Sequence, residues 1–396
     1  MFADIVSRAG YGEVVPPILE DIGVFARLGE QTDVVTKEMY DFVDKGGRHV
    51  ALRPEQTASV ARLFVEHRPT LPFRAWYSGP NFRYEKPQKG RYRQFDQCGV
   101  EALGSSDPDL DIEVISLAWD FFAALGLQHV DLVVNSLGEP TDRAAFTDAL
   151  GRFAASRADE LSDAGRTTLE KNPLRLLDSK RADDIAVMAD APRIDEYWSS
   201  TARDHHDAVL QGLHALGIPV IEDRRLVRGL DYYRFTTFEF RSPALDGAQN
   251  AIGGGGRYDG LVEDLGGPPT PGVGFALGVE RTLLACDAEE VGRIHGPQAD
   301  VFVVDTSTSG AALRLSTALR RAGYRCERSY DHRSMKSQMK AADRAGATLA
   351  LIVGEDEAAS DTVLVRDMRH DSPQSLVHQT DVVEYIRQVL TPQSDV

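Results

Sequence analysis

A short basic segment stands out in an otherwise acidic chain. Five cations and one anion, Glu85, lie between Arg83 and Arg93, whereas the chain of 396 residues carries a formal net charge of -17. Residues 74–79 and 94–101 on either side have the composition of β-strands. Arginine offers planar donors that match phosphate oxygens, and a strand would fix its position. The residues alone leave two interpretations open, an anion site and a solvated hairpin tip.

Three further charged residues are candidates for a binding site. Arg228 lies between apolar and aromatic neighbours and Arg281 lies where a strand is predicted to turn into a helix, so each needs an anionic partner or ligand. Glu55 precedes a predicted helix, where an acidic residue commonly stabilises the first turn. His205 and His206 fall in a helical segment and are interpreted as a solvated face rather than as ligands.

A glycine tract at 253–256 invites comparison with nucleotide-binding loops. No Gly-Lys-Ser/Thr follows it, and no Gly-x-Gly-x-x-Gly stands at a strand-to-helix turn, which argues against both common phosphate loops. Glycines beside Arg257 and Tyr258 either let the backbone approach a small ligand closely or form a plain turn. Both interpretations stay open from the residues alone.

Length and composition indicate a globular protein of two or three domains. The hydrophobic fraction is 42%, and no apolar run approaches the roughly 20 residues that cross a bilayer, so no membrane partner is expected. The N-terminus resembles neither a signal nor a transit peptide, which makes the cytoplasm the expected location. Three widely spaced cysteines predict neither a zinc site nor disulfides. The acidic balance argues against broad nonspecific binding of nucleic acid.

The elements that would position these residues form an α+β pattern. A strand-like stretch at 10–20 leads into a hairpin, a helix, the basic loop between its two strands, another helix and a strand. The pattern changes at 139, and residues from about 141 to 216 are predicted to be helical. Strands then return before a final strand-to-helix junction. The predicted ranges are strands 38–44, 49–54, 129–135, 220–222, 236–240 and 250–252, helices 57–67 and 107–125, and the junction 273–284.

Strands and helices alternate after residue 300, which predicts a separate α/β domain. Residues 291–297 are the expected linker. The predicted strands are 301–304, 325–330, 348–353 and 362–367, and the predicted helices are 310–322, 335–345 and 382–390.

Several segments together resemble the histidyl-tRNA synthetase family, which belongs to the class II aminoacyl-tRNA synthetases. The resemblance covers nearly the whole chain. Motifs 1, 2 and 3 of class II are matched by residues 10–20, 82–95 and 272–281. The segments distinctive of the histidine enzymes are matched by 52–58 (LRPEQTA), 226–233 (LVRGLDYY) and 254–261 (GGGRYDGL).

This resemblance implies a fold, a reaction and partners. Residues 1–138 and 217–290 are expected to form the class II catalytic domain, with a six-stranded antiparallel sheet and flanking strands and helices. A helical insertion domain at 139–216 and a C-terminal α/β anticodon-binding domain at 298–396 are expected beside it, in a homodimer. The implied reaction activates histidine with ATP to histidyl-adenylate and transfers the histidyl group to the 3′ end of tRNA(His).

The resemblance also implies an ATP site. Arg83 is expected to bind the α-phosphate and Arg281 the γ-phosphate, while Arg91 lies near the β- and γ-phosphates. Phe95 is expected to stack on the adenine. Mg²⁺ is expected to arrive with ATP, held mostly by phosphates and water, without a metal site of the protein's own. Gln88 is placed near the extra 5′ nucleotide of the tRNA.

The implied catalytic residues are Arg228 and Arg83, which would neutralise charge that builds on the α-phosphate as the histidine carboxylate attacks. Glu55 and Thr57 are expected to hold the α-amino group of histidine, and Glu101 is expected to read an imidazole nitrogen. The full set implied to bind histidine is Glu55, Thr57, Arg83, Gln97, Glu101, Arg228, Tyr232, Tyr233 and Tyr258.

Two alternatives are weighed against this interpretation. The regulatory subunit of ATP phosphoribosyltransferase resembles the same catalytic domain but binds histidine as a sensor. Such relatives typically lack the anticodon-binding domain and lose catalytic arginines, whereas this chain keeps Arg83, Arg228 and Arg281. A stand-alone RNA-binding module leaves the histidine site unexplained. One departure is that the family usually begins further upstream, so a misassigned start or a truncated N-terminus is expected, which puts dimer stability in question.

Overall fold

The computed structural model describes residues 1–26, 37–227, 232–245, 250–292, 298–331, 333–370 and 372–390. The chain divides into two units, Met1–Arg293 and Ile294–Val396. Most of the linker predicted at 291–297 lies outside the described residues. Among the described residues, no helix is long and apolar enough to cross a membrane.

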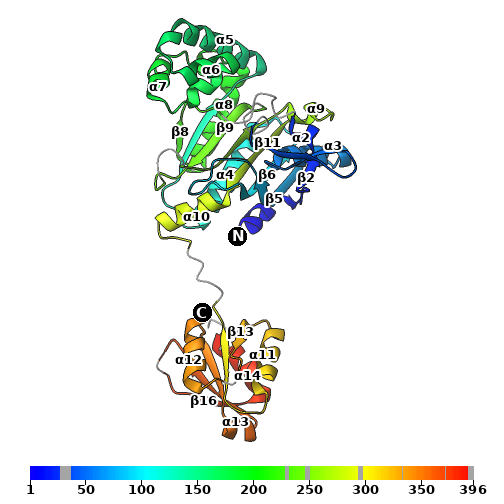
Figure 1. Ribbon diagram of the computed structural model, residues 1–396, viewed down its shortest axis with the longest axis vertical. Helices are drawn as coiled ribbons and strands as arrows, with labels where there is room; N and C mark the ends of the chain where they lie inside the picture. The colour runs from blue at the N-terminus through cyan, green and yellow to red at the C-terminus, as the bar shows by residue number, and fades with distance from the viewer. Residues whose placement is uncertain are drawn as a thin grey trace. The chain divides into compact units, whose positions relative to one another are not determined.

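A sheet of eight strands forms the centre of the first unit (Figure 1). Its spatial order is β1 (Gly12–Glu13), β5 (Phe73–Phe82), β6 (Gln94–Leu103), β11 (Gly272–Gly278), β10 (Ala251–Arg257), β9 (Arg234–Arg241), β7 (Asp131–Ser136) and β8 (Val220–Glu222). The six strands from β5 to β7 pair antiparallel, while β1 and β8 add parallel edges. The expected α+β fold with an antiparallel sheet and flanking strands is confirmed.

The basic loop is held by the two longest strands of this sheet. β5 and β6 pair without a register shift from Phe73 opposite Leu103 to Phe82 opposite Gln94. Just beyond this ladder the backbone N–H of Arg83 donates to the carbonyl of Arg93 at 2.9 Å. The loop 83–93 therefore starts and ends at fixed points, as the sequence predicted.

The glycine tract is neither a loop nor a turn, because it forms the central strand β10. A Cβ added at Gly255 would lie 2.0 Å from the carbonyl oxygen of Gly274, and one at Gly253 would lie 2.4 Å from the Leu277 side chain. Glycine has a low strand propensity, so its presence here reflects crowding between neighbouring strands. The interpretation of the tract as a turn is wrong. Its glycines allow the backbone of β10 to lie close to the neighbouring strand β11.

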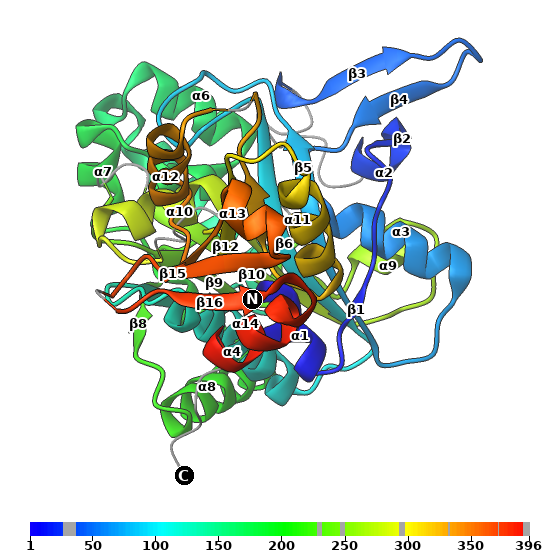
Figure 2. The same ribbon diagram turned by 90° about the horizontal axis from the view of Figure 1, so that it is seen from below.

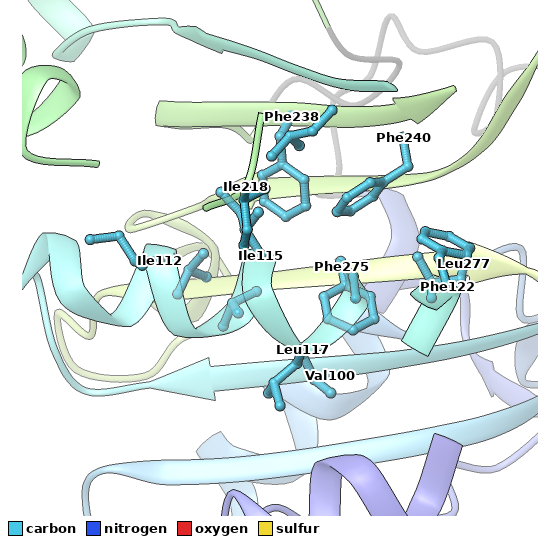
Figure 3. Close-up of a cluster of buried hydrophobic side chains, with 14 of the residues drawn as sticks. Val100, Ile112, Ile115, Leu117, Phe122, Ile218, Phe238, Phe240, Phe275 and Leu277 are labelled. Carbon is cyan, nitrogen blue, oxygen red and sulfur yellow. The ribbon is translucent and has the colours of Figure 1, made fainter. Parts of the chain in front are cut away.

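Helices cover one face of the sheet with an apolar core (Figure 3). The long helix α4 (Pro108–Ala124) begins after Asp107, whose side chain accepts the N–H of Asp109 at 3.0 Å, and proline occupies its first position. Phe122 of α4 is 1% exposed and packs edge-on to Phe240 of β9, with ring centroids 5.2 Å apart. The helices α1 (Phe2–Arg8) and α10 (Val279–Ala288) also contribute to this core.

A small sheet lies beside the large one, in the order β2 (Leu19–Asp21), β4 (His49–Leu52) and β3 (Tyr40–Val43). β3 and β4 form the predicted hairpin, which extends away from the other elements of the first unit in Figure 2. The helix α3 (Thr57–His67) follows it, with the bounds predicted from the sequence. Two short helices, α2 (Ile22–Ala26) and α9 (Leu261–Asp264), pack nearby.

The segment between β7 and β8 is helical, as predicted. It contains α5 (Pro140–Ser156), α6 (Asp163–Lys171), α7 (Ala182–Met188) and α8 (Ser200–Ala215), with 3-10 turns at Ala158–Glu160, Pro173–Asp178 and Ile194–Glu196. Figure 1 shows α5, α6 and α7 together at one end of the unit, with α8 between them and the sheet. Apolar residues of this segment share one cluster with Tyr232, Tyr233 and Tyr258.

The second unit is an α/β domain with a five-stranded sheet. The strand order is β13 (Cys326–Arg328), β12 (Val301–Asp305), β14 (Leu349–Val353), β15 (Thr362–Asp367) and β16 (Ser375–His378). The helices are α11 (Ala311–Arg321), α12 (Met335–Arg344), α13 (Glu355–Ala359) and α14 (Val382–Leu390), with a 3-10 turn at Gln379–Asp381. The predicted alternation is confirmed, although α13 and β16, both short, were not predicted.

Candidate active site

Arg83 is held rigidly where β5 ends and the basic loop begins. Its Nε donates to the carbonyl oxygen of Pro54 at 2.9 Å, and its guanidinium lies 5.2 Å from the centroid of the Phe95 ring. The contact with the ring is a cation–π interaction, which is strongest away from water. Arg83 therefore reaches the site with little freedom left to lose when a ligand binds.

The loop 83–93 folds over the sheet and closes a first pocket of about 210 Å³. Strands β6, β10 and β11 and the start of α10 supply the rest of its lining. Its lining includes Arg83, Glu85, Arg91, Phe95, Gln97, Gly254, Glu280 and Arg281. Three of these residues are arginines, so the pocket concentrates positive charge in an acidic protein.

Arg281 ties the loop to the sheet from the first turn of α10. Its Nη1 donates to the carbonyl of Ala251 at 2.9 Å and its Nε to that of Gly90 at 3.3 Å. Burial, and then the nearby charge of Arg91, lower the pKa of Arg281. Among the described residues no carboxylate lies within ion-pairing distance of Arg281, whereas Arg91 pairs with Glu85 at 3.3 Å. An anionic ligand would relieve this repulsion.

A second, smaller pocket of about 130 Å³ adjoins the first, since Arg83, Gln97 and Gly254 line both. Its other lining residues include Glu55, Thr57, Glu101, Tyr232, Tyr233, Tyr258 and Gly274. Carboxylates, hydroxyls and aromatic rings thus surround a space suited to a small polar molecule.

Glu101 of β6 is the central acidic group of this second pocket. Its Oε1 accepts hydrogen bonds from Thr57 Oγ1 at 2.7 Å and from the Tyr77 hydroxyl at 3.1 Å, and its Oε2 accepts one from the Tyr258 hydroxyl. Gly274 lies opposite Glu101 in the sheet, and a Cβ there would lie 1.9 Å from Glu101 Oε2. Burial raises the pKa of Glu101 to about 8. A carboxyl that titrates near neutral pH in a cleft is typical of a functional site.

Glu55 both caps the start of α3 and lines the second pocket, and the sequence suggested each of these roles. Its carboxylate accepts the backbone N–H groups of Thr57 at 2.7 Å and of Ala58 at 2.9 Å, which satisfies the start of α3. The same side chain lines the second pocket and is 4% exposed. Burial raises its pKa, and the helix N-terminus and Arg83 act in the opposite direction.

Aromatic rings close the pocket on one side. The ring centroids of Tyr232 and Tyr233 lie 4.6 Å apart, and those of Tyr232 and Tyr258 lie 5.7 Å apart. Gln97 is oriented by Asn81, whose Nδ2 donates to Gln97 Oε1 at 2.8 Å. These contacts leave the pocket lined by side chains that are already fixed.

The structure brings together most of the residues singled out in the sequence. Arg83, Arg91, Phe95 and Arg281 line the first pocket, and Glu55, Thr57, Arg83, Gln97, Glu101, Tyr232, Tyr233 and Tyr258 line the second. Gln88 is exposed on the loop, outside both pockets, and pairs with Arg91 through backbone hydrogen bonds of 2.9 and 3.2 Å. Arg228 lies outside the described residues.

Sequence reasoning missed two residues and misplaced two others. Tyr77 and Glu85 take part in the pockets but were not selected, although alternation along β5 could have placed Tyr77 on the same face as the pocket. The prediction that His205 and His206 form a solvated face is wrong. His206 is 1% exposed, with its Nε2 3.2 Å from Glu222 Oε2, because α8 packs against other elements on more than one side.

The arrangement as a whole can bind a polyanion next to a small polar molecule. No three His, Cys, Asp or Glu side chains of the described residues cluster so as to hold a metal ion. The cationic pocket is built for phosphates, and the acidic, aromatic pocket beside it is built for a group with N–H donors.

Two family models match the chain. That of histidyl-tRNA synthetase matches residues 1–282, and that of an anticodon binding domain matches residues 298–389. Each range falls within one of the two units of the structure.

Individual relatives agree with these matches. A histidine–tRNA ligase of Geobacillus kaustophilus is 49% identical over 372 residues, which cover 92% of this chain and 87% of the relative. A histidine–tRNA ligase of Corynebacterium kroppenstedtii is 48% identical, and the match covers 98% of this chain and 91% of the relative. Among solved structures, apo histidyl-tRNA synthetase of S. aureus has a TM-score of 0.79 and 35% identity, with 97% and 93% of the two chains covered.

Proposed function

The chain belongs to the histidyl-tRNA synthetase family, and we propose that the chemistry of this family takes place in the two adjoining pockets. The protein is a histidine–tRNA ligase. In the first step a carboxylate oxygen of histidine attacks the α-phosphorus of ATP, and the bond to diphosphate breaks. In the second step a hydroxyl at the 3′ end of tRNA(His) attacks the carbonyl of histidyl-adenylate, and AMP leaves.

One observation carries the assignment of the pockets. Arg83 lies at the junction, where it lines the cationic and the acidic pocket together. A group at this position can neutralise charge on the α-phosphate while histidine is held next to it. Proximity of the two reactants accounts for much of the rate in such reactions.

ATP is proposed to occupy the first pocket with Mg²⁺ bound to its phosphates. Arg281 would take the γ-phosphate and Arg91 the β- and γ-phosphates, since both cations line this pocket together with Arg83. Phe95 would stack on the adenine. Because Arg83 already covers one face of the Phe95 ring at 5.2 Å, the base is proposed to use the other face.

Histidine is proposed to occupy the second pocket. Glu55 and Thr57 would bind the α-amino group, and Glu101 and Tyr233 the imidazole nitrogens. The buried carboxylate of Glu55 supports this orientation because it lies near Arg83 and therefore near the proposed site of attack. Gln97, Tyr232 and Tyr258 would complete the pocket, and Arg228 would neutralise charge on the α-phosphate from the opposite side.

The tRNA is proposed to contact both units. Gln88 is exposed on the basic loop, where it could meet the extra 5′ nucleotide. In the second unit, the lining of a hollow includes Phe302, Arg328, Tyr330, Arg333 and Arg344, beside the acidic Glu327 and Asp331. The Arg328 guanidinium lies 4.5 Å from the centroid of the exposed Tyr330 ring. Aromatic rings beside cations favour unstacked RNA bases, so this hollow is proposed to receive the anticodon.

The domain division and the assembly are part of the same proposal. Residues 1–138 and 217–290 would be the catalytic domain, 139–216 the insertion and 298–396 the anticodon-binding domain. A homodimer is supported by exposed apolar side chains on the small sheet and the segment before it, namely Val15, Ile18, Leu19, Phe42 and Val43. A cytoplasmic location stays a prediction from the sequence.

The sensor alternative is less well supported. A Bacillus halodurans structure described as an ATP phosphoribosyltransferase regulatory subunit/histidyl-tRNA synthetase has a TM-score of 0.59 at 22% identity, which indicates a shared fold alone. A histidine sensor has no need for Arg83, Arg91 and Arg281 around the first pocket.

The proposal is tested by ATP–diphosphate exchange with each of the twenty amino acids in turn. Exchange is expected with histidine and is expected to fall by orders of magnitude in Arg228→Ala, while the circular dichroism spectrum is unchanged. Exchange with no amino acid would favour the sensor. Near-normal exchange by Arg228→Ala would remove Arg228 from the mechanism.

A further inference from the structure

The helix α8 contributes residues to two separate apolar clusters of the first unit. Val209 and Leu213 belong to the core under the large sheet, whereas Ala202 belongs to the cluster that contains the pocket tyrosines. Gly212 lies against Ile112 of α4 so closely that an added Cβ would be 2.2 Å from Ile112 Cδ1. The position of α8 is therefore fixed against α4 along its second half.

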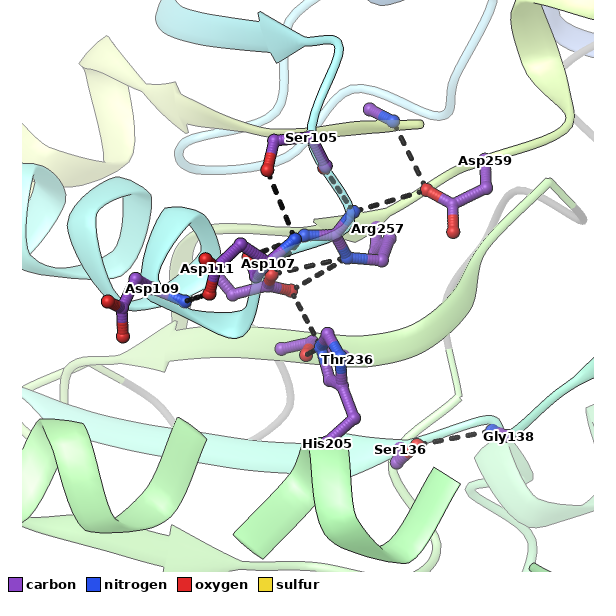
Figure 4. Close-up of polar contacts among 11 residues, drawn as sticks. Ser105, Asp107, Asp109, Asp111, Ser136, Gly138, His205, Thr236, Arg257 and Asp259 are labelled. Atoms are coloured by element: carbon purple, nitrogen blue, oxygen red, sulfur yellow. Dashed lines mark hydrogen bonds and ion pairs between the residues drawn. The ribbon is translucent and has the colours of Figure 1, made fainter. Parts of the chain in front are cut away.

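A buried ion pair lies next to this contact (Figure 4). Asp111 of α4 and Arg257 of β10 are both fully buried, and the Arg257 Nε and Nη2 donate to both oxygens of Asp111. Arg257 Nη1 also donates to the carbonyl of Ser105 at 2.8 Å and to Asp259 Oδ1 at 3.3 Å. Burial acts to raise the pKa of Asp111, but contacts with His205 and Arg257 outweigh it and lower that pKa. A pair with this many partners is rigid.

This ion pair holds one wall of the histidine pocket. Tyr258 stands between Arg257 and Asp259 in the sequence, and its N–H donates to the carbonyl of Gly272 at 2.8 Å. Asp259 Oδ1 accepts the Gly272 N–H at 3.1 Å. The Tyr258 side chain, fixed at its base in this way, donates its hydroxyl to Glu101. A displacement of Arg257 would therefore be transmitted to Glu101.

His205 of α8 contacts this network from the side of the helical segment (Figure 4). Its Nε2 lies 3.6 Å from Asp111 Oδ1 and 3.3 Å from Thr236 Oγ1. Its ring also lies 5.1 Å from that of Phe235. Phe235 has a φ of 48°, a left-handed conformation that is strained for an aromatic residue and persists only where the surroundings enforce it.

Phe235 forms a second connection to the pocket. Its N–H donates to the carbonyl of Gly138 at 3.0 Å, and its carbonyl accepts the N–H of Leu137 at 2.8 Å, so this strained residue at the start of β9 is anchored next to the start of the helical segment. Tyr233 lies two residues earlier in the chain and lines the pocket. His205 thus contacts both routes, one through Asp111 and one through Phe235.

We propose that His205 is a positioning residue for the histidine pocket, which couples the helical segment 140–215 to the affinity for histidine. This inference rests on the proposed function of the second pocket. Among the described residues, His205 contacts Asp111, Thr236 and Phe235, and none of these lines the first pocket, so its effect is expected to fall mainly on histidine.

The test is His205→Phe, which keeps the ring packed on Phe235 but removes the Nε2 contacts with Asp111 and Thr236. In ATP–diphosphate exchange by the full chain, the KM for histidine is expected to rise on the order of tenfold, as for other small displacements of positioning groups, while the KM for ATP is unchanged. His205→Gln keeps an N–H donor and is expected to recover part of the loss. His214→Phe, on the exposed face of the same helix, is the matched control and is expected to behave as the unmodified chain.

A merely structural role would lower the amount of active protein, which reduces kcat and leaves both KM values unchanged. A wild-type KM for histidine in His205→Phe, or an equal rise in both KM values, would overturn the inference. If the unmodified chain shows no exchange with histidine, the proposed function itself fails. This failure is distinguishable from failure of the His205 inference, because it is seen in the unmodified chain before any variant is measured.

Discussion

Thr57 and Glu101, 44 residues apart in the sequence, are joined by a hydrogen bond of 2.7 Å from Thr57 Oγ1 to Glu101 Oε1. The bond links the start of α3 to the C-terminal part of β6. It therefore joins the residue proposed to bind the α-amino group of histidine to the one proposed to bind its imidazole. The two ends of the substrate would then be recognised by one connected set of side chains.

The state of Glu101 predicts a proton release when histidine binds. Burial raises the pKa of Glu101 to about 8, so in the empty pocket the carboxyl is mostly protonated at pH 7. An imidazole N–H donated to Glu101 stabilises its ionised form more than its neutral form, so binding is expected to lower this pKa and to expel a proton. Isothermal titration calorimetry at pH 7 in buffers of different ionisation enthalpy is expected to show this release, and the release is expected to vanish above about pH 9, where Glu101 is already ionised.

The matched variant is Glu101→Gln, which cannot release this proton. Any release that it retains comes from histidine itself and is subtracted from that of the unmodified chain. Equal release by the two proteins at pH 7 would show that Glu101 does not change its ionisation, and would assign it a structural role.

The phosphate site predicts a different response. Arg281→Ala removes a cation that has no carboxylate partner among the described residues, and loss of a charged hydrogen bond is expected to raise the KM for ATP by about tenfold to a hundredfold. Arg281→Lys keeps the charge but loses the planar fork, so an intermediate KM is expected. The KM for histidine is expected to stay near its normal value.

Arg325→Ala is a suitable control for this experiment, because Arg325 is exposed in the second unit, away from both pockets, and pairs with Asp300. Initial rates of exchange at varied ATP give the comparison directly. A normal KM for ATP in Arg281→Ala would mean that Arg281 serves only to hold the carbonyls of Gly90 and Ala251.

Much of the fold follows from local patterns. The strands around the basic loop and the helix α3 were predicted because hydrophobic spacing and turn residues there agree with the final structure. The two pockets depend instead on the order of strands in the sheet. Only the pairing of β6 with β11 brings Glu101 opposite Gly274, and that pairing joins segments too distant for any local pattern to show.

Two features were not predicted because the usual preferences of the residue types differ from the structure that they form here. The glycine tract forms a strand because its neighbours leave no room for a Cβ, although glycine is a weak strand former. His205 and His206 look like surface residues, yet Asp111 and Glu222 provide partners that allow His205 to be mostly covered and His206 to be buried. The partners come from other elements, so the sequence around the histidines does not reveal them.

The hollow in the second unit predicts an effect on tRNA alone. Tyr330→Ala removes a ring on which a base can stack, a contact worth about 1–3 kcal/mol, so the KM for tRNA(His) in aminoacylation is expected to rise about fivefold to a hundredfold. ATP–diphosphate exchange, which needs no tRNA, is expected to be unchanged. Arg369→Ala, an exposed cation of the same unit, is the control. A normal KM for tRNA would place the anticodon elsewhere.

The hairpin of β3 and β4 predicts the state of assembly. Phe42 and Val43 are neighbours in β3 and so point to opposite faces, yet they are 46% and 64% exposed, which leaves both faces of the hairpin uncovered. Exposed apolar side chains of this kind are typical of an interaction surface, and a second copy of the chain is the proposed partner. Val43→Asp is expected to shift the protein from dimer to monomer in sedimentation velocity and to reduce exchange activity, since a charge in the interface would be buried without a partner. Leu313→Asp, at a comparably exposed position of α11, is expected to change neither property. A Val43→Asp protein that still sediments as a dimer would exclude this hairpin from the interface.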